Sequence, residues 1–335
     1  MRNSLILPAT VSGAYAQLLR EWLQSVRSPD EKLLSELELL RPLERVPLTT
    51  WEHWLQQAAK TQESSDFALA IGALTDHRHL GLLAHLTRYA PTLKNALDDY
   101  LRFEGLQYGA TWGRLVDLPE STGLRWYRPD ILDPLVEIVG LASFYAYVRK
   151  YYSAKNVIEI SFTFPRPADT SAYDDYFDCP VEFDQPFLQL KFPQHAMRSR
   201  VGQRDEALHE RLLAVSAQSL NLSDPANELI QELVHFMQDS LPEGGAVLER
   251  FAEQRGVTPR AFQKQLAASG LNFRSLLNSV RQNAAIHFLE DQALTLAEVA
   301  FLLGYSEQSA FNHAFVSWFG KTPKSYREKY IFKNN

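Results

Sequence analysis

The sequence contains almost no cysteine, no long apolar run and no common catalytic motif. The single cysteine among 335 residues, Cys179, excludes an internal disulfide framework and favours a reducing cytoplasm. No stretch of about 18 apolar residues occurs, so we expect no membrane span. G-x-S-x-G, H-E-x-x-H, Walker and G-x-G-x-x-G patterns are also missing. We therefore expect neither an enzyme nor a protein with a bound cofactor.

Histidines gather in "DHRH" (76–79), followed by His85, without the spacing of a metal site. His77 and His79 are two positions apart and do not share a helix face. No cysteine or acidic set with structural-zinc spacing follows them. We expect ordinary surface or core histidines and no metal.

The composition is that of a globular protein with an uneven charge distribution. Apolar residues make up 45% and aromatic residues 12%, and the length allows two domains with separate cores. The net charge is −6, but residues 240–335 contain 11 Lys and Arg against 8 Asp and Glu, a net charge of +3. The remainder therefore carries −9. This asymmetry favours contact with a polyanion through the C-terminal part alone.

The two ends of the chain differ in their secondary-structure patterns. Residues 1–215 predict an α+β domain, in which segments 106–118 and 122–129 form a hairpin, Asp133-Pro134 begins a helix, and 157–164 alternates as a strand. Residues 216–225 form a polar linker. No strand pattern follows, so 226–335 predicts an all-helical domain.

The C-terminal segment contains an internal repeat. Ala252 and Gly256 match Ala300 and Gly304, 48 positions later. The alanine permits close helix approach, and the glycine permits a tight turn at positive φ. Thr258 and Ser306 are the expected N-caps of the following helices. These are the parts of a helix-turn-helix, present twice and joined by an amphipathic helix at 275–290.

The second helix of each repeat combines an apolar stripe with a polar face. The stripes are Phe262 and Leu266, then Phe311, Phe315 and Phe319. Side chains of the types on the polar faces can read base edges: Arg260, Gln263 and Lys264 in the first repeat, and Gln308, Ser309, Asn312 and His313 in the second. The alternative is the surface of an ordinary helical bundle. Two matched copies followed by basic residues favour DNA binding.

"AFLLGYSEQSAFNHAFVSWFGKTPKSYR" (300–327) resembles the signature of AraC/XylS-type transcription regulators. The matching positions are Ala300, Gly304, Tyr305, Ser309, Phe311, Phe315, Gly320, Pro323, Tyr326 and Arg327. The stretch "FTFPRPADTSAYDDYFDCPVEFDQPFLQLKFPQHAM" (162–197) is similar to the arabinose-binding-type N-terminal domain of regulators such as those of ornithine utilisation. Together these two resemblances cover nearly the whole chain.

The resemblance implies that both repeats enter the major groove of double-stranded promoter DNA, about one helical turn apart. Lys321, Lys324 and Arg327 are then expected near phosphates, although Arg327 is equally suited to a structural role at a helix end. His313 and Val316 stand where the family often has basic residues. We therefore expect the first repeat to supply more of the base specificity.

For the N-terminal domain, the resemblance implies effector sensing and, in some members, dimerisation. The aromatic and basic residues that we expect to bind an effector are Tyr108, Trp112, Arg114, Arg125, Trp126, Tyr127 and Arg128. The alternative is that these aromatics are core and these arginines solvated. The function expected is a cytoplasmic regulator whose effector changes DNA affinity or RNA polymerase contact. The alternative is a constitutive regulator whose N-terminal domain only dimerises or binds a protein.

Overall fold

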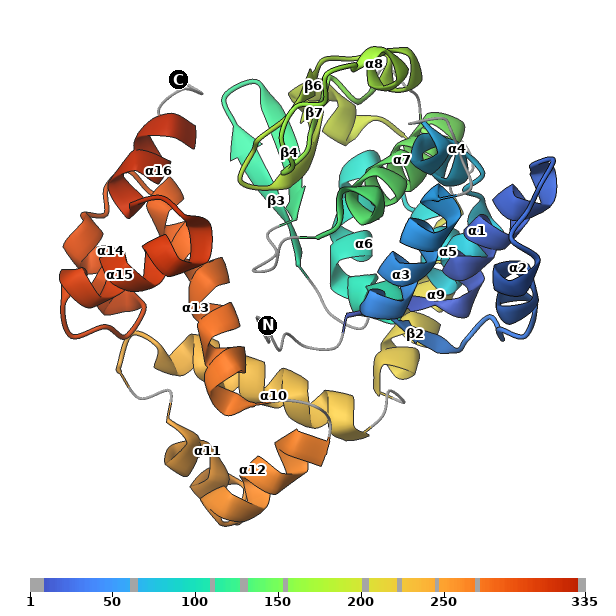
Figure 1. Cartoon of the computed structure of the whole chain (residues 1–335). Helices are drawn as coiled ribbons and strands as arrows, with labels where there is room; N and C mark the ends of the chain where they lie inside the picture. Colours follow the sequence, from blue (N-terminus) through green and yellow to red (C-terminus); the bar gives the residue numbers. More distant parts are fainter. Residues whose placement is uncertain are drawn as a thin grey trace. The chain divides into compact units, whose positions relative to one another are not determined.

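The computed structural model describes residues 9–60, 66–108, 112–126, 132–152, 156–200, 205–221, 225–244, 247–268 and 272–330. They form two compact parts (Figure 1): an N-terminal part of described residues up to 221, and a C-terminal part of those from 225 onward. Each part has a hydrophobic core of its own.

Helices make up most of the N-terminal part, and most of them bury one face. The apolar spacing of α1, for example, buries Tyr15, Leu19 and Trp22 together. Asp133 caps α7 by accepting the Leu135 N–H, and Pro134 occupies the first helical position, as predicted. The helices are α1 Gly13–Ser25, α2 Glu31–Glu38, α3 Leu48–Ala59, α4 Phe67–Ala73, α5 His77–Arg88, α6 Leu93–Tyr108, α7 Pro134–Tyr151, α8 Ser171–Phe177 and α9 Glu206–Asn221.

The N-terminal part contains two sheets. β1 (Thr10–Ser12) pairs antiparallel with β2 (Arg45–Pro47). The larger sheet has the order β3-β4-β7-β5-β6 and is antiparallel except for the pair β5–β6. Its strands are β3 Gly113–Leu118, β4 Ser121–Trp126, β5 Glu159–Ser161, β6 Val181–Glu182 and β7 Leu188–Pro193, and a 3-10 helix, η2 (Gln194–Arg198), follows β7.

Three predicted segments differ in extent from the structure. The predicted hairpin is present as β3 and β4, but α6 continues to Tyr108, so the first strand begins later than expected. Only Glu159–Ser161 of 157–164 forms a strand. Helix α9 extends to Asn221, through six residues of the predicted linker, because Ser216 is buried and Ala217 packs against the core.

The described C-terminal residues contain helices and no strand. The helices are α10 Pro225–Ser240, α11 Leu248–Gln254, α12 Pro259–Ala268, α13 Phe273–Glu290, α14 Leu296–Leu302, α15 Gln308–Phe319 and α16 Pro323–Tyr330. An α+β part followed by an all-helical part confirms the predicted fold class. Side chains from α10 to α13 form one core, which includes Leu233, Phe251 and Phe262.

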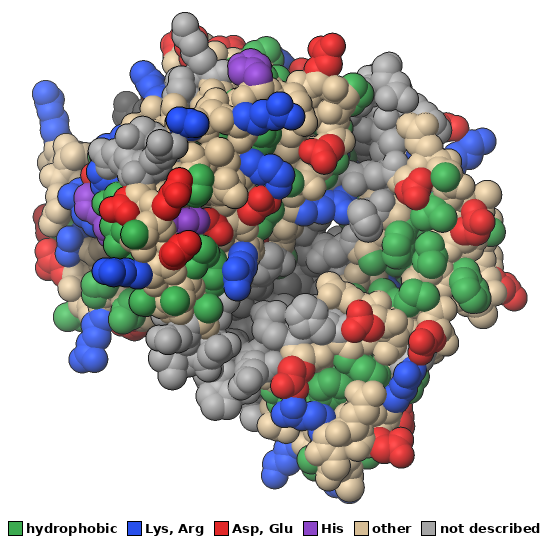
Figure 2. Space-filling view, turned by 180° about the vertical axis from the view of Figure 1, so that it is seen from behind, with side chains coloured by type: hydrophobic (Ala, Val, Ile, Leu, Met, Phe, Trp, Pro, Cys, Tyr) green, Lys and Arg blue, Asp and Glu red, His purple; other side chains and the backbone are tan. Residues whose placement is uncertain are grey.

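The described surface has mixed charge. On the face drawn in Figure 2, Lys and Arg side chains are interspersed with Asp and Glu, so charge of one sign does not cover that face. None of the described helices is long and apolar enough to cross a membrane.

Candidate nucleic-acid interface and effector site

The two sequence repeats have the same turn. In the first repeat, α11 and α12 are joined through Gly256 at φ 65°, and the Val257 N–H donates to the Ala252 carbonyl at 3.0 Å. In the second, α14 and α15 are joined through Gly304 at φ 73°, and the Tyr305 N–H donates to the Ala300 carbonyl at 3.0 Å. Only glycine adopts this left-handed conformation without a steric cost. The equivalence inferred from sequence is therefore also a geometric equivalence.

The predicted stripes are buried except at Phe319, which is half-buried. Phe262, Leu266, Phe311 and Phe315 are each at most 2% exposed. Phe315 also contacts Phe319, with ring centres 4.5 Å apart. Since these faces are fixed in the core, the opposite faces of α12 and α15 must point outward.

The N-terminal caps of α12 and α15 differ. Thr258 caps α12, because its hydroxyl accepts the Ala261 N–H at 3.2 Å. The prediction that Ser306 caps α15 is wrong: Glu307 holds that position and makes no side-chain cap bond. The Glu307 carboxylate instead accepts the Ser309 hydroxyl at 3.0 Å, which places a negative charge beside a predicted base contact.

Most of the predicted base-reading side chains are exposed. Arg260, Gln263 and Lys264 are exposed on α12, as are Gln308, Ser309 and His313 on α15. Asn312 is half-buried, and its Oδ1 has no hydrogen-bond partner among the described residues. The first repeat thus presents two cations, while the second presents amide, hydroxyl and imidazole groups beside Glu307.

Two arginines of the C-terminal part hold backbone carbonyls. Arg281 of α13 donates to the carbonyls of Leu303 at 2.9 Å and Gly304 at 3.2 Å, and so fixes the second turn. Arg327 of α16 donates to the Leu289 carbonyl at 3.1 Å and the Leu294 carbonyl at 2.7 Å. The structural role expected for Arg327 is therefore present, while contact of its remaining N–H groups with phosphate stays a prediction.

The other two predicted phosphate contacts lie where α16 begins. Lys324 is exposed in its first turn, and Lys321, half-buried, precedes it. Backbone N–H groups at a helix N-terminus favour anions. This end of α16 therefore combines N–H groups with the Lys324 ammonium.

One exposed cation near the first repeat was not predicted. Arg274, in the first turn of α13, and Gln263 of α12 both line an open hollow of about 690 Å³ between α11, α12 and α13. Arg274 lies outside the second helix of the repeat, so the spacing of the polar faces does not point to it. The hollow places the basic Arg274 and the acidic Glu249 beside Gln263 of α12.

Comparison with known protein families agrees with this geometry. A family model described as "Arabinose-binding domain of AraC transcription regulator, N-term" matches residues 31–201, and a helix-turn-helix domain model matches residues 251–329. The chain belongs to the AraC family of transcription regulators. The predicted resemblance is confirmed over both parts.

Curated relatives of this AraC-family chain include the following two transcription regulators. The "HTH-type transcriptional regulator VirS" of Mycobacterium tuberculosis is 32% identical over 50% of this chain and 48% of its own length. The "Ornithine utilization regulator" of Pseudomonas aeruginosa is 28% identical over 51% of this chain and 50% of its own length. The chain thus spans about half the length of the curated relatives it matches. The crystal structure of the regulator CdpR from Pseudomonas aeruginosa aligns with a TM-score of 0.47 at 22% identity, covering 93% of this chain and 97% of that chain.

Several of the predicted effector residues that the structure describes have partners within the protein. Arg125 is buried, donates to Gln189 Oε1 at 2.6 Å and lies 4.0 Å from the centre of the Phe187 ring. Arg114 lies opposite Arg125 in the β3–β4 ladder. Trp112 and Trp126 both contact Glu104, while Tyr108 alone lines the cavity described below. Tyr127 and Arg128 fall outside the described residues.

Glu104 of α6 is a buried carboxylate that the sequence reading missed. It accepts the N–H groups of Trp112 at 2.9 Å and Gly113 at 3.0 Å, and the indole N–H of Trp126 at 2.8 Å. The Tyr100 hydroxyl lies 3.5 Å away. Burial raises the pKa of Glu104 to about 7. Glu104 thus joins α6 to β3 and β4, and a lone Glu in an amphipathic helix gives no sequence signal of this role.

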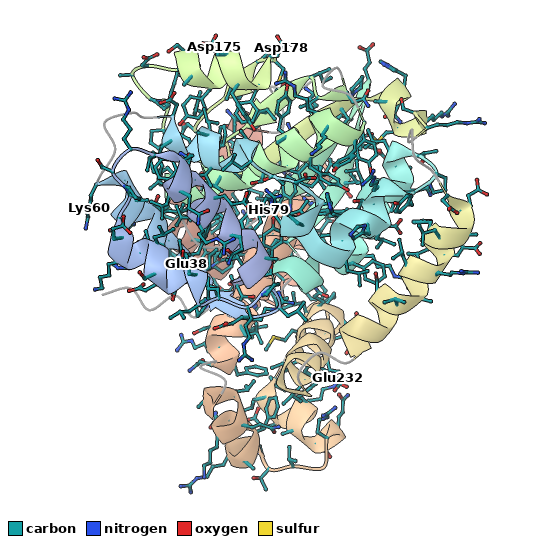
Figure 3. The ribbon with its side chains drawn as sticks, turned by 90° about the vertical axis from the view of Figure 1, so that its right-hand side faces the viewer. Glu38, Lys60, His79, Asp175, Asp178 and Glu232 are labelled. Atoms are coloured by element: carbon teal, nitrogen blue, oxygen red, sulfur yellow. The ribbon has the colours of Figure 1, made fainter. Side chains whose placement is uncertain are left out.

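The histidine group of the N-terminal part has structural partners. His79 is 1% exposed, and Figure 3 shows it among the helices. Its Nδ1 accepts the Asp76 N–H at 3.0 Å, and its Nε2 lies 3.2 Å from Glu21 Oε1. Within the described residues no three His, Cys, Asp or Glu side chains are grouped as metal ligands would be. His79 closes the capping box of α5.

Proposed function

We propose that this chain is a sequence-specific DNA-binding regulator that acts at promoters in the cytoplasm. The observation that carries the proposal is the pair of equivalent turns at Gly256 and Gly304, each followed by a helix with a buried stripe and an exposed polar face. Helices of this kind fit the major groove. Arg260, Gln263 and Lys264 of the first repeat and Gln308, Ser309, Asn312 and His313 of the second are the proposed base contacts, and Lys321 and Lys324 the proposed phosphate contacts.

We also propose that the N-terminal part senses a small molecule and thereby alters DNA affinity or contact with RNA polymerase. Helix α9 is suited to transmit such a change. It packs on α5 and α6, and His209 Nε2 lies 2.7 Å from Asp99 Oδ2 of α6. Because α9 ends three residues before α10, a shift of α5 or α6 would act on the connection to the DNA-binding helices.

The alternative is a constitutive regulator whose N-terminal part only dimerises or binds a protein. Footprinting of the full-length chain on the DNA flanking its own gene tests the DNA-binding proposal. We expect protection on one side of the DNA at two major-groove faces about one turn apart. The double variant Arg260→Ala/His313→Ala should lose it, while the control Lys94→Ala, exposed on α6, should keep it. Protection that does not depend on sequence would contradict the proposal.

Repeating the footprint with fractionated cell metabolites tests sensing. A sensor should change its operator affinity with one fraction. Equal affinity across all fractions would favour the constitutive alternative.

A further inference from the structure

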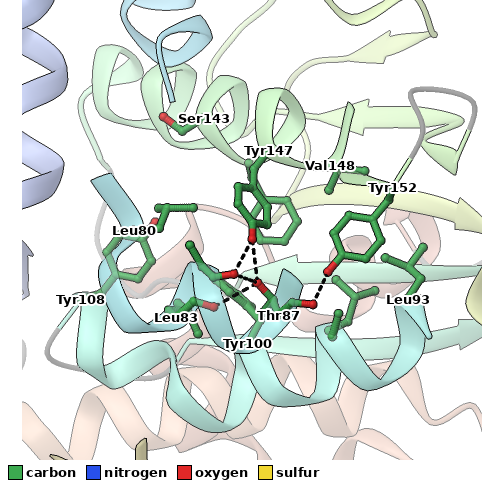
Figure 4. Close-up of a pocket in the computed structure, with 14 residues that line it drawn as sticks. Leu80, Leu83, Thr87, Leu93, Tyr100, Tyr108, Ser143, Tyr147, Val148 and Tyr152 are labelled. Carbon is green, nitrogen blue, oxygen red and sulfur yellow. Dashed lines mark hydrogen bonds between the residues drawn. The ribbon is translucent and has the colours of Figure 1, made fainter. Parts of the chain in front are cut away.

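A small cavity lies in the N-terminal part between α5, α6 and α7 (Figure 4). Its volume is about 30 Å³. Leu80, Leu83, Leu97, Phe144 and Val148 form most of its wall, and no charged side chain lines it. A charged ligand there would lose its hydration without an ion partner, which disfavours anions and cations alike.

The hydroxyl groups at one end of the cavity are occupied by the protein. Tyr147 donates to the Ala84 carbonyl at 2.6 Å, and Tyr152 donates to the Thr87 carbonyl at 2.6 Å. The Thr87 hydroxyl lies 3.1 Å from the Tyr147 hydroxyl and 3.0 Å from the Leu83 carbonyl. Figure 4 shows these bonds running between the wall residues. This end of the cavity therefore offers apolar contacts to an occupant, because its hydroxyl protons are used within the protein.

Besides the hydroxyls of Tyr100 and Tyr108, which lie near each other, the wall contains the Ser143 hydroxyl. Ser143 Oγ accepts the Tyr15 hydroxyl at 3.1 Å, and among the described residues it donates its own proton to no group. The nearby Glu104 carboxylate already accepts three N–H groups, so it is not available to a ligand. An occupant can thus receive a hydrogen bond from Ser143.

One wall of the cavity contains a break that permits enlargement. A space of 30 Å³ holds only one or two water molecules. However, α5 is interrupted at Gly81, whose φ of 56° and ψ of −135° are not helical. Leu80 and Leu83, on either side of this break, both line the cavity. Glycine has the greatest backbone freedom, so Gly81 is the position of α5 best suited to a change of φ and ψ that displaces Leu80 and enlarges the cavity.

We propose that this cavity binds a small, uncharged, mainly apolar molecule with a hydrogen-bond acceptor, and that such a molecule is the effector. The effector role of this molecule rests on the sensing function proposed above. The arginines of β3 and β4 offer no charge to this occupant, because Arg125 is bound to Gln189 and neither Arg125 nor Arg114 lines the cavity.

Three probes with the same ring and different charge test the class: benzyl alcohol, benzoate and benzylammonium. Binding to the full-length chain is measured by ligand-observed NMR. We expect benzyl alcohol to bind at least tenfold more tightly than either ion. Ala96→Val should weaken that binding at least tenfold, because Ala96 lines the cavity. The matched control Ala207→Val, at an exposed position of α9, should not change it.

If Ala96→Val does not fold, nuclear Overhauser contacts from the benzyl alcohol ring to the methyl groups of Leu83, Leu97 and Val148 locate the probe in the unmodified protein. Contacts to these methyls support the proposal. Tighter binding of an ion, no binding of benzyl alcohol, or contacts only elsewhere would overturn it. Operator affinity is measured separately: if another metabolite changes it while benzyl alcohol does not bind, sensing stands and the cavity proposal falls.

Discussion

Substitution of Arg260 tests whether this residue contacts a base or a phosphate. It is exposed on the polar face of α12, opposite the buried Phe262. We expect Arg260→Ala to cost about 1–3 kcal/mol of binding free energy on the cognate site and to relax specificity at one base position. Binding to a library of operator variants measures both effects, with the exposed Gln265→Ala as control. Equal weakening on every sequence would mean that Arg260 contacts phosphate.

Lys324 is expected to contribute charge without sequence information. Its side chain is 76% exposed, and its Nζ is 3.9 Å from Glu328 Oε1. Lys324→Ala should weaken binding to all sequences and reduce the slope of log K against log salt by about one unit. Titrations at several salt concentrations measure the slope. The control Lys60→Ala, exposed on the N-terminal part, should leave it unchanged; a slope unaltered in Lys324→Ala would remove this residue from the interface.

Arg327 should act on stability, in contrast to Lys324. Its guanidinium donates to the carbonyl of Leu289, in the last turn of α13, and to the carbonyl of Leu294, just after that helix. Arg327→Ala removes two charge-assisted bonds, so we expect the free energy of unfolding to fall by about 2–3 kcal/mol. Urea denaturation of the full-length chain followed by circular dichroism measures it. Unchanged stability together with weaker DNA binding would show that phosphate contact is the main role.

At the scale of elements, the two turns are equivalent in conformation but not in surroundings. Gly256 has open space where a Cβ would lie, whereas a Cβ at Gly304 would be 2.8 Å from the Leu241 carbonyl. Gly256→Ala should therefore cost about 1 kcal/mol for the left-handed backbone alone. Gly304→Ala should cost clearly more, because backbone must move. Denaturation of both variants gives the comparison, and equal losses would contradict the argument.

The sequence predicted those elements whose causes are local. The Ala–Gly spacing and the phenylalanine stripe follow from helix geometry, so both turns and the buried face of α15 were predicted. The cap at Ser306 was wrong because the cap position depends on where the turn ends, one residue later at Glu307.

Contacts between distant residues could not be predicted. Glu104 meets Trp126 across 22 positions, and Arg327 meets Leu289 across 38. The extent of α9 depends on the burial of Ser216, which its local sequence does not reveal. The partners of the predicted effector residues are of the same kind, since the contact of Arg125 with Gln189 joins residues 64 positions apart.

At the scale of the whole molecule, Glu104 predicts a pH dependence of stability. Burial raises its pKa from 4.5 to about 7, so between these values the folded chain binds more protons than the unfolded chain. This contribution to the free energy of unfolding therefore falls as pH rises through that window, by at most about 3 kcal/mol. Urea denaturation at pH 5 and pH 8 should show a smaller decrease in Glu104→Gln than in the unmodified chain. The control Glu38→Gln, at an exposed position, should behave as the unmodified chain does; identical pH dependence in Glu104→Gln would contradict the role of burial.

The place of α10 in the C-terminal core determines how short an independent DNA-binding fragment can be. Leu229, Leu233 and Met237 of α10, and Leu241 directly after it, are all at most 6% exposed. At ~1.5–3 kcal/mol for each buried side chain, they contribute about 6–12 kcal/mol, which is similar to the whole stability of a typical domain. A fragment of residues 222–335 should therefore fold, and one of residues 245–335, which keeps both repeats, should not. Circular dichroism distinguishes them, and a helical, cooperatively melting shorter fragment would show that the repeats are autonomous. We therefore expect that the two repeats fold as a stable domain only together with α10.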